Sequence, residues 1–301
     1  MLCCQSDTDV TDAATKPGAI TKYSNVYPSD YNGPFSKFCI DDTPYASMSA
    51  AGLTDGTIPL TQLTVSQKAG FSIIEYKGDG SNANKTVAHG LGKKPEFIMV
   101  KAKTETSRHW LIWSHNIGND EALIFDASLQ AGSRFGPSAP DENHFGVYGG
   151  QGNRATQTFT AWCWTSIPGF SKFGQYKSAF TGTSHRDGVM VETGFKPAIV
   201  MIKCIANSNQ EWVIFDNVRG GDGEPNANDS YRNSIDGCLY MEGSSDQIGP
   251  GSTREIDFYS NGFRARNSGG PLNGTIDRTY MYMAWGSEAA AAMFGVQATA
   301  R

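Results

Sequence analysis

Residues Pro95–Lys101 read PEFIMVK, and residues Pro197–Lys203 read PAIVMIK. Proline, methionine and lysine recur at the same places, with an offset of 197 − 95 = 102 residues. Each stretch is a short run of β-branched and other apolar residues that begins after a proline, a pattern typical of a β-strand. A repeated strand of this kind indicates that one structural unit occurs twice in the chain.

The repeat extends on both sides of this strand. HWLIWS (His109–Ser114) aligns with EWVIFD (Glu211–Asp216) at the same offset and without a gap. Upstream, GFSIIEYK (Gly70–Lys77) is echoed by GFSKFGQYK (Gly169–Lys177). Because several separate stretches agree in order, we interpret them as two copies of one module.

The two copies differ in length. At their far ends TAWCW (Thr160–Trp164) aligns with MAWGS (Met283–Ser287), which superposes Trp162 on Trp285 at an offset of 285 − 162 = 123 residues. The second copy therefore contains extra residues. We expect them in Gly220–Ser230, a stretch with the composition of a loop.

The hydrophobic pattern within each copy has a period of two, in short runs bounded by Gly, Pro, Asn and Asp. The chain holds 34 glycines and only 18% charged residues, which suits strands joined by tight turns. We predict an all-β fold of two tandem antiparallel β-sandwich units of the jelly-roll or Ig-like type. The expected parts are an extended N-terminal arm over 1–45, a first unit over 46–167 with a leading strand within 46–69, a second unit over 168–287, and a short C-terminal helix and tail over 288–301.

Composition excludes several classes of partner. The net charge of −5 gives no electrostatic reason to bind nucleic acid or an anionic membrane. The longest apolar stretch, Ala289–Val296, is far shorter than the roughly 18 residues that span a bilayer. The first residues, MLCCQSDTDVTDAATKPG, lack the basic and apolar regions of a secretory signal. We therefore expect no nucleic-acid partner, no membrane insertion and synthesis in the cytoplasm.

The tryptophans of the repeat are the expected core. On a strand, Trp110 and Ile112 share one face, and Trp212 and Ile214 repeat them in the second copy. The apolar frame recurs while the neighbouring histidines do not, so burial is the simplest interpretation. The expected repeat core comprises Trp110, Ile112, Trp162, Trp212, Ile214 and Trp285.

Four residues are candidates for ligand binding. Trp113 is replaced by phenylalanine in the second copy, and Trp164 has Ser287 opposite it, so these two rings are the least constrained by the repeat. His109 and His115 lie about 20 Å apart on an extended chain, too far to share one metal ion unaided. The candidates are Trp113, Trp164, His109 and His115, with burial as the alternative for both rings.

The chain lacks the common catalytic motifs GxSxG, the P-loop, HExxH and the EF-hand loop. A glycan-cleaving enzyme needs two carboxylates about 5 to 10 Å apart, and the spacing selects no pair among Asp126, Glu142, Asp216 and Asp257. The acidic loop carrying Asp222, Glu224 and Asp229 is a weak calcium candidate, with a solvated loop as the alternative. We expect no catalytic residue and no cofactor.

The ordered runs GFSIIEYKGDG, TVAHGLGKKPEFIMVK, a tryptophan-containing strand and FTAWCWTSIPGFSKFGQYK resemble a repeat domain of virion structural proteins from tailed phages, especially marine ones. Proteins of this family are commonly labelled tail fibre or hypothetical structural protein. The resemblance covers 46–287, and its most specific part is W-x-x-x-PGFSKFG over Trp164–Gly174. The second copy departs from the pattern, because it carries VETGFKP where the first has His89 in HGLG.

This resemblance implies a non-enzymatic virion protein, most directly a tail fibre or receptor-binding component. It implies docking to other virion proteins through residues 1–45, assembly with itself, with a trimer as the commonest case for fibres, and a host receptor or glycan as a further partner. A capsid decoration or head-fibre protein is the first alternative. A host-glycan-binding or glycan-degrading surface enzyme is the second.

Overall fold

The protein was analysed as a computed structural model. It describes residues 38–40, 55–105, 108–124, 129–130, 134–179, 188–206, 210–218, 234–235, 237–241, 254–266, 270–274 and 276–286. The acidic loop 220–230, the tail 288–301 and all of the arm 1–45 except its residues 38–40 lie outside these ranges.

The first half is built on an eight-stranded sheet with the spatial order β1-β2-β3-β10-β5-β6-β7-β8. The strands are β1 (Phe38–Ile40), β2 (Leu60–Ser66), β3 (Phe71–Lys77), β10 (Thr158–Trp164), β5 (Phe97–Ala102), β6 (Leu111–Ser114), β7 (Ala122–Ile124) and β8 (Leu129–Gln130). Neighbours are antiparallel except β1 and β2, which are parallel. β2 pairs with β3 on its other side, so the segment before the first copy extends the sheet of that copy.

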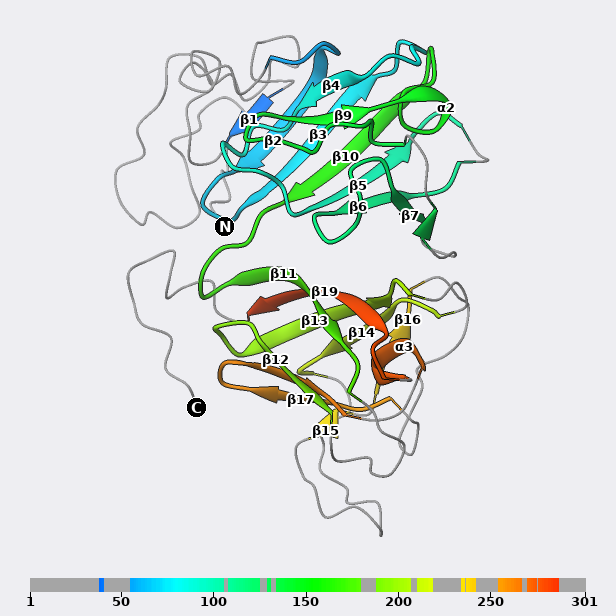
Figure 1. The fold of residues 1–301 in the computed structure, drawn as a ribbon. Coiled ribbons are helices and arrows are strands. Elements are labelled where there is room, and N and C mark those ends of the chain that lie inside the picture. The colour runs from blue at the N-terminus through cyan, green and yellow to red at the C-terminus, as the bar shows by residue number, and fades with distance from the viewer. Residues whose placement is uncertain are drawn as a thin grey trace, which may run out of the picture.

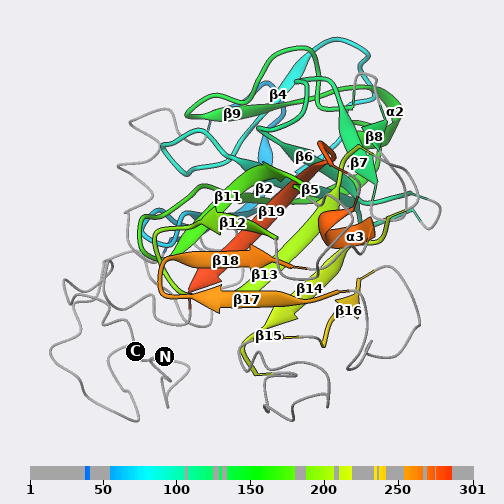
Figure 2. The same cartoon turned by 60° about the horizontal axis from the view of Figure 1, so that its bottom comes forward.

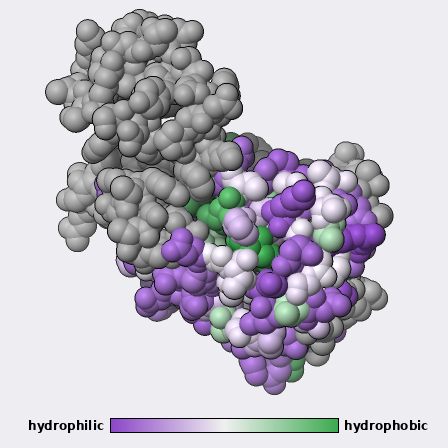
Figure 3. Space-filling view, turned by 90° about the horizontal axis from the view of Figure 1, so that it is seen from above, coloured by the Kyte–Doolittle hydropathy of each residue, from purple (hydrophilic) through white to green (hydrophobic). Residues whose placement is uncertain are grey.

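A small second layer covers one face of this sheet. It consists of β4 (Lys85–Ala88) paired antiparallel with β9 (His144–Val147), followed by the short helix α2 (Gly149–Gly152). Phe159, Ala161 and Cys163 alternate along β10 and face the hydrophobic core between the two layers. The view from above in Figure 3 shows a mostly hydrophilic or neutral surface with one small hydrophobic patch beside atoms drawn in grey.

The second half also has two sheets. One has the order β11-β19-β13-β14-β16 and the other β12-β18-β17-β15. Their strands are β11 (Ser171–Lys177), β19 (Thr279–Gly286), β13 (Pro197–Cys204), β14 (Val213–Asp216), β16 (Leu239–Tyr240), β12 (Val189–Glu192), β18 (Gly262–Ala265), β17 (Ile256–Tyr259) and β15 (Ser234–Ile235). The short helix α3 (Gly270–Asn273) precedes β19, and a second hydrophobic core lies between the sheets.

The strand orders of the two halves correspond. β3-β10-β5-β6-β7 in the first half matches β11-β19-β13-β14-β16 in the second, and the pair β4-β9 matches β12-β18. The chain is therefore all-β, with several antiparallel sheets and, among the described residues, only four-residue helices. No helix in the described part of the chain is long and apolar enough to cross a membrane.

Strand pairing corrects the expected alignment of the tryptophans. Trp164 pairs with Phe71 and Phe97, and Trp285 pairs with the equivalent positions Ser171 and Ile199. The position equivalent to Trp162 is thus Met283, and the offset on this strand is 121 rather than 123 residues, because 285 − 164 = 121. The superposition of Trp162 on Trp285 is wrong by two residues.

The large sheets of the two halves pack against each other through a third hydrophobic cluster. Phe97 of β5 stacks on Phe173 of β11, with ring centroids 6.2 Å apart. Figures 1 and 2 show the resulting layers, with β4–β9 at one side, the two large sheets in the middle and β12–β18–β17–β15 at the other side. Both faces of each large sheet are therefore packed over part of their area.

Candidate functional site

The two candidate tryptophans of the first half are packed inside the protein. Trp113 is 1% exposed and belongs to the core between the eight-stranded sheet and β4–β9. Trp164 lies between the halves, with its ring centroid 5.0 Å from that of Phe71 and 5.6 Å from that of Phe97. Trp113 is thus corrected from a binding platform to a core residue, and Trp164 contributes to the packing between the sheets.

The two candidate histidines are both exposed. His109 lies just before β6 and His115 just after it. The backbone N–H and Nδ1 of His115 both lie within hydrogen-bond distance of the carbonyl oxygen of Glu96, at 2.9 and 3.2 Å. Among the described residues, no group of three His, Cys, Asp or Glu side chains is arranged to hold a metal ion.

Two of the carboxylates considered for glycan cleavage lie in different sheets. Asp257 in β17 is 0% exposed, forms an ion pair with Arg266 and accepts a hydrogen bond from the hydroxyl of Tyr259 at 2.9 Å. Asp216 ends β14 and accepts the backbone N–H of Val218 at 3.0 Å. Asp257 is therefore held by its cationic neighbour Arg266.

His89 occupies a buried turn between β4 and β5. Its Nδ1 accepts the backbone N–H of Leu91 at 3.2 Å, so Nε2 carries the proton and donates to the carbonyl oxygen of Asp141 at 3.2 Å. Burial lowers the pKa of His89 from 6.5 to about 4. The ring is therefore neutral near pH 7, with both nitrogens used in hydrogen bonds.

Thr193 takes the role of His89 in the second half. The backbone N–H of Thr193 donates to the carbonyl of Asn261, as that of His89 does to Asn143. Thr193 Oγ1 accepts the N–H of Phe195 at 3.4 Å, two residues later, which reproduces the contact of the histidine ring. Because a hydroxyl makes the same backbone contact in the second half, we interpret His89 as a turn cap.

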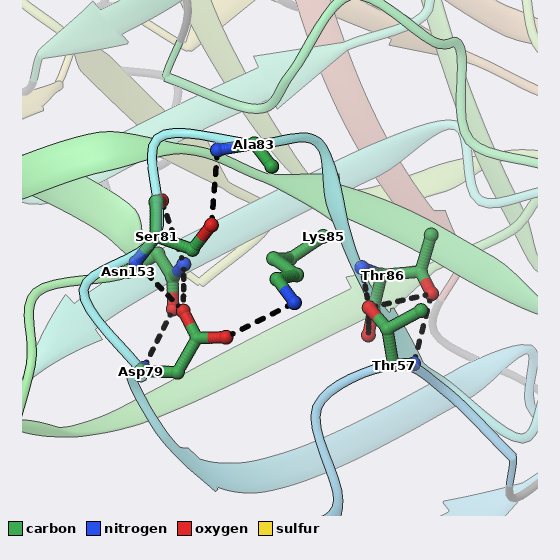
Figure 4. A network of polar contacts seen from close by, with 7 residues as sticks. All are labelled: Thr57, Asp79, Ser81, Ala83, Lys85, Thr86 and Asn153. Carbon is green, nitrogen blue, oxygen red and sulfur yellow. Dashed lines mark hydrogen bonds and ion pairs between the residues drawn. The ribbon is translucent and has the colours of Figure 1, made fainter.

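A polar network in the first half surrounds Asn153, which follows α2 (Figure 4). The buried Asn153 amide donates to Asp79 Oδ1 at 2.8 Å and to the carbonyl of Ser81 at 3.1 Å, and accepts the N–H of Asp79 at 3.1 Å. Lys85 Nζ lies 3.3 Å from Asp79 Oδ2. The hydrogen bond from the Ser81 backbone is the main reason that the pKa of Asp79 is lowered. The network ties the turn after β3 to α2.

The second half repeats this clamp with Asn273, the last residue of α3. Asn273 is buried, accepts the N–H of Ala179 at 3.3 Å and donates to the carbonyl of Arg266 at 2.8 Å. Our sequence analysis missed both asparagines. The signal was present as GGQGN (Gly149–Asn153) and GGPLN (Gly269–Asn273), in which GGxxN recurs.

A tyrosine beneath each short helix is the second repeated contact. Tyr76 donates its hydroxyl to the carbonyl of Gly152 at 2.7 Å, and Tyr176 donates to that of Leu272 at 2.6 Å. The rings stack on Phe159 and Tyr280, with centroids 5.3 and 5.2 Å apart. Burial raises the pKa of both tyrosines well above 10, so both remain protonated donors.

A lysine over a tryptophan is the third repeated contact. Lys101 Nζ lies 5.8 Å from the centroid of the Trp110 ring, and Lys203 Nζ lies 5.8 Å from that of Trp212. Each lysine also donates to a backbone carbonyl two residues before its tryptophan, that of Arg108 or Gln210. The pair fixes the turn that leads into β6 or β14.

A model of the family described as "Domain of unknown function (DUF7483)" matches residues 26–289 of this chain. The chain belongs to the DUF7483 family. No curated protein and no solved structure matches it significantly.

The DUF7483 match spans both halves of the molecule. It begins before β1 and ends after β19, so it includes all four sheets and the cluster that packs the halves together. The family domain in this chain is therefore the pair of halves. The family description assigns no activity.

Proposed function

We propose that this DUF7483 chain is a virion structural protein of a tailed phage, a non-enzymatic display module, most directly a tail-fibre or receptor-binding component. In this proposal it folds as two tandem β-sandwiches of jelly-roll or Ig-like type, over 46–167 and 168–287. Residues 1–45 dock the protein to other virion proteins, and the remaining surface is presented to the host.

The observation that carries the proposal is that the polar contacts identified as recurring between the halves, within the described residues, serve the fold. The Asn153 and Asn273 amides, the Tyr76 and Tyr176 hydroxyls and the lysine pair all bind backbone groups of turns and short helices. Duplication has thus maintained a framework. A framework with variable side chains around it suits display better than catalysis.

The variable side chains lie at the ends of the framework strands. His109 and His115 of the first half are replaced by Glu211 and Asn217 at the equivalent positions of the second. His109 and His115 are both exposed. Exposed residues that differ between copies are positions at which a host-facing surface can change without cost to the fold.

Immunoelectron microscopy of the virions tests the proposal, with antibody raised against residues 70–287. We expect label on intact particles at the tail. Absence of the protein from purified particles, checked by mass spectrometry, would overturn it.

A capsid decoration or head-fibre protein is the alternative assignment within the virion. Quantitative mass spectrometry separates the two, because tail components are present in far fewer copies per particle than components that follow the capsid lattice. A copy number that matches the major capsid protein would replace the tail assignment by the capsid one.

A further inference from the structure

The two halves pack through the outer faces of their large sheets, and equivalent positions on these faces differ in burial. Five positions on the outer face of the second half are buried, whereas their equivalents in the first half are half-buried. In the order second half, then first half, the pairs are Phe173 and Ile73, Met281 and Thr160, Met283 and Trp162, Lys203 and Lys101, and Trp212 and Trp110. The first half therefore retains accessible surface at positions where the second half is buried.

Another set of positions on the same outer faces shows the opposite difference in exposure. Phe97 is 1% exposed and its equivalent Ile199 is 36% exposed. Ile112 and Leu123 are fully buried in the first half, whereas the equivalents Ile214 and Leu239 are half-buried. Here the second half retains accessible surface.

These two patterns define a heterologous contact. The first half contributes its Phe97–Ile112–Leu123 side, and the second half contributes its Phe173–Met281–Met283 side, so the two modules do not offer the same patch to each other. A heterologous contact between equivalent modules leaves on each module one patch whose equivalent in the other module is buried. We name these the Trp162 patch (Ile73, Trp110, Thr160 and Trp162) and the Ile199 patch (Ile199, Ile214, Val218 and Leu239).

We infer that the Trp162 patch of one chain docks on the Ile199 patch of a second copy, repeating between chains the packing that joins the halves within a chain. The two patches are the equivalents of surfaces already in contact. Each combines apolar side chains with charged ones, because Thr160 pairs with Glu75 and Lys101, and Ile199 pairs with Asp216. The Trp162 patch includes the tilted pair Trp110 and Trp162, with centroids 5.2 Å apart. The Ile199 patch includes Val218, which is 85% exposed.

The geometry sets the kind of assembly. Each chain offers one patch of each type, so copies add head to tail and form a closed ring or an open fibre. An isologous dimer needs the same patch on both partners and is not what this surface provides. The inference goes beyond the proposed function, since it concerns self-association wherever the protein acts.

Sedimentation velocity of the full chain over a concentration series tests the inference. The wild type is expected to show a weight-average sedimentation coefficient that rises with concentration. Ile199→Glu and Trp162→Glu are each expected to remove the rise, because each buries a charge in the contact. The equimolar mixture of these two variants is expected to form a two-chain species and nothing larger, since one intact contact remains between them.

Ile276→Glu is the matched control, because Ile276 is 53% exposed and lies at the opposite end of β19 from the residue that pairs with Ile199. It is expected to associate as the wild type does. Ile73→Glu on β3 disrupts the same patch without removing an indole, and it replaces Trp162→Glu if circular dichroism shows that the latter is unfolded.

Three results would overturn the inference. The first is a wild type that remains monomeric at every concentration. The second is a mixture of the two variants that remains monomeric although both are folded. The third is a monomeric wild type that binds host oligosaccharide through Trp162, which would assign the patch to a carbohydrate instead of a second copy.

Discussion

The inner faces of the two halves are alike, and their outer faces and edges are not. Inside each half, a tyrosine reaches a short helix, an asparagine lies at the end of that helix, and a residue after the strand β4 or β12 caps a turn. Outside, Trp212 is buried between the halves while the equivalent Trp110 is half-buried. The comparison separates what the module needs in order to fold from what its position in the chain adds.

The sheet edges show the same separation. In the first half β2 and β1 continue the sheet beyond β3. In the second half the linker turns back on β11, where Ile167 and Ser171 exchange backbone hydrogen bonds and Ser166 Oγ accepts the N–H of Phe173 at 3.2 Å. The exposed Lys177 ends the strand. Two extra strands protect one edge, and a turn with a charged residue protects the other.

The largest expected effect comes from the equivalent tryptophans. Trp212→Ala should lower the free energy of unfolding by about 3 to 5 kcal/mol, since the ring is fully buried and leaves a cavity. Trp110→Ala should cost about half as much or less, because part of its ring is already exposed. Urea denaturation followed by fluorescence measures both. Equal losses would contradict the unequal use of the two faces.

The second prediction concerns the pH dependence of stability, to which His89 contributes and the equivalent Thr193 does not. His89 has a pKa of about 4 in the folded protein and 6.5 when unfolded, so the unfolded chain binds a proton that the folded chain does not between these values. The free energy of unfolding should fall as pH is lowered from 6.5 to 4, by about 3 kcal/mol from this residue alone. Thermal or urea midpoints across this range measure the fall.

The control is His89→Thr, which copies the cap of the second half. This variant should fold and should lose stability less steeply than the wild type over the same pH range. Asp141 and His144 lie beside the ring and remain in both proteins, so the difference between the two curves isolates His89. Parallel curves would show that folding does not lower the pKa of His89.

Much of this framework could be predicted because strands alternate their side chains. Period-two runs gave the major strands, and the repeat gave their correspondence. The pairing of Trp162 with Trp285 failed because a shift of two residues leaves the same face inward, so alternation cannot detect it. Alternation also separates the face of Trp113 from that of Ile112 but cannot show that both are covered. A sheet packed on both sides buries both.

The third prediction compares the two asparagine clamps. Asn153→Ala should cost about 2 kcal/mol, because it removes hydrogen bonds to Asp79 and Ser81 and leaves buried groups without partners. Asn273→Ala should cost less, since the amide makes a long contact of 3.3 Å to Ala179 and one of 2.8 Å to Arg266. Urea midpoints rank the two variants. The reverse order would contradict the ranking of the two variants by the hydrogen bonds that they lose.

The smallest effect provides the closest test of equivalence. Tyr76→Phe and Tyr176→Phe each remove one hydroxyl whose hydrogen bond to the helix carbonyl has nearly the same length, 2.7 and 2.6 Å. Each should cost about 1 kcal/mol, because the ring stays and only the buried hydrogen bond is lost. The sites lie in separate hydrophobic cores, so the double variant should show the sum of the two losses. A double variant that loses clearly more than this sum would show that the cores are coupled through the packed faces, which would join the halves into one cooperative unit.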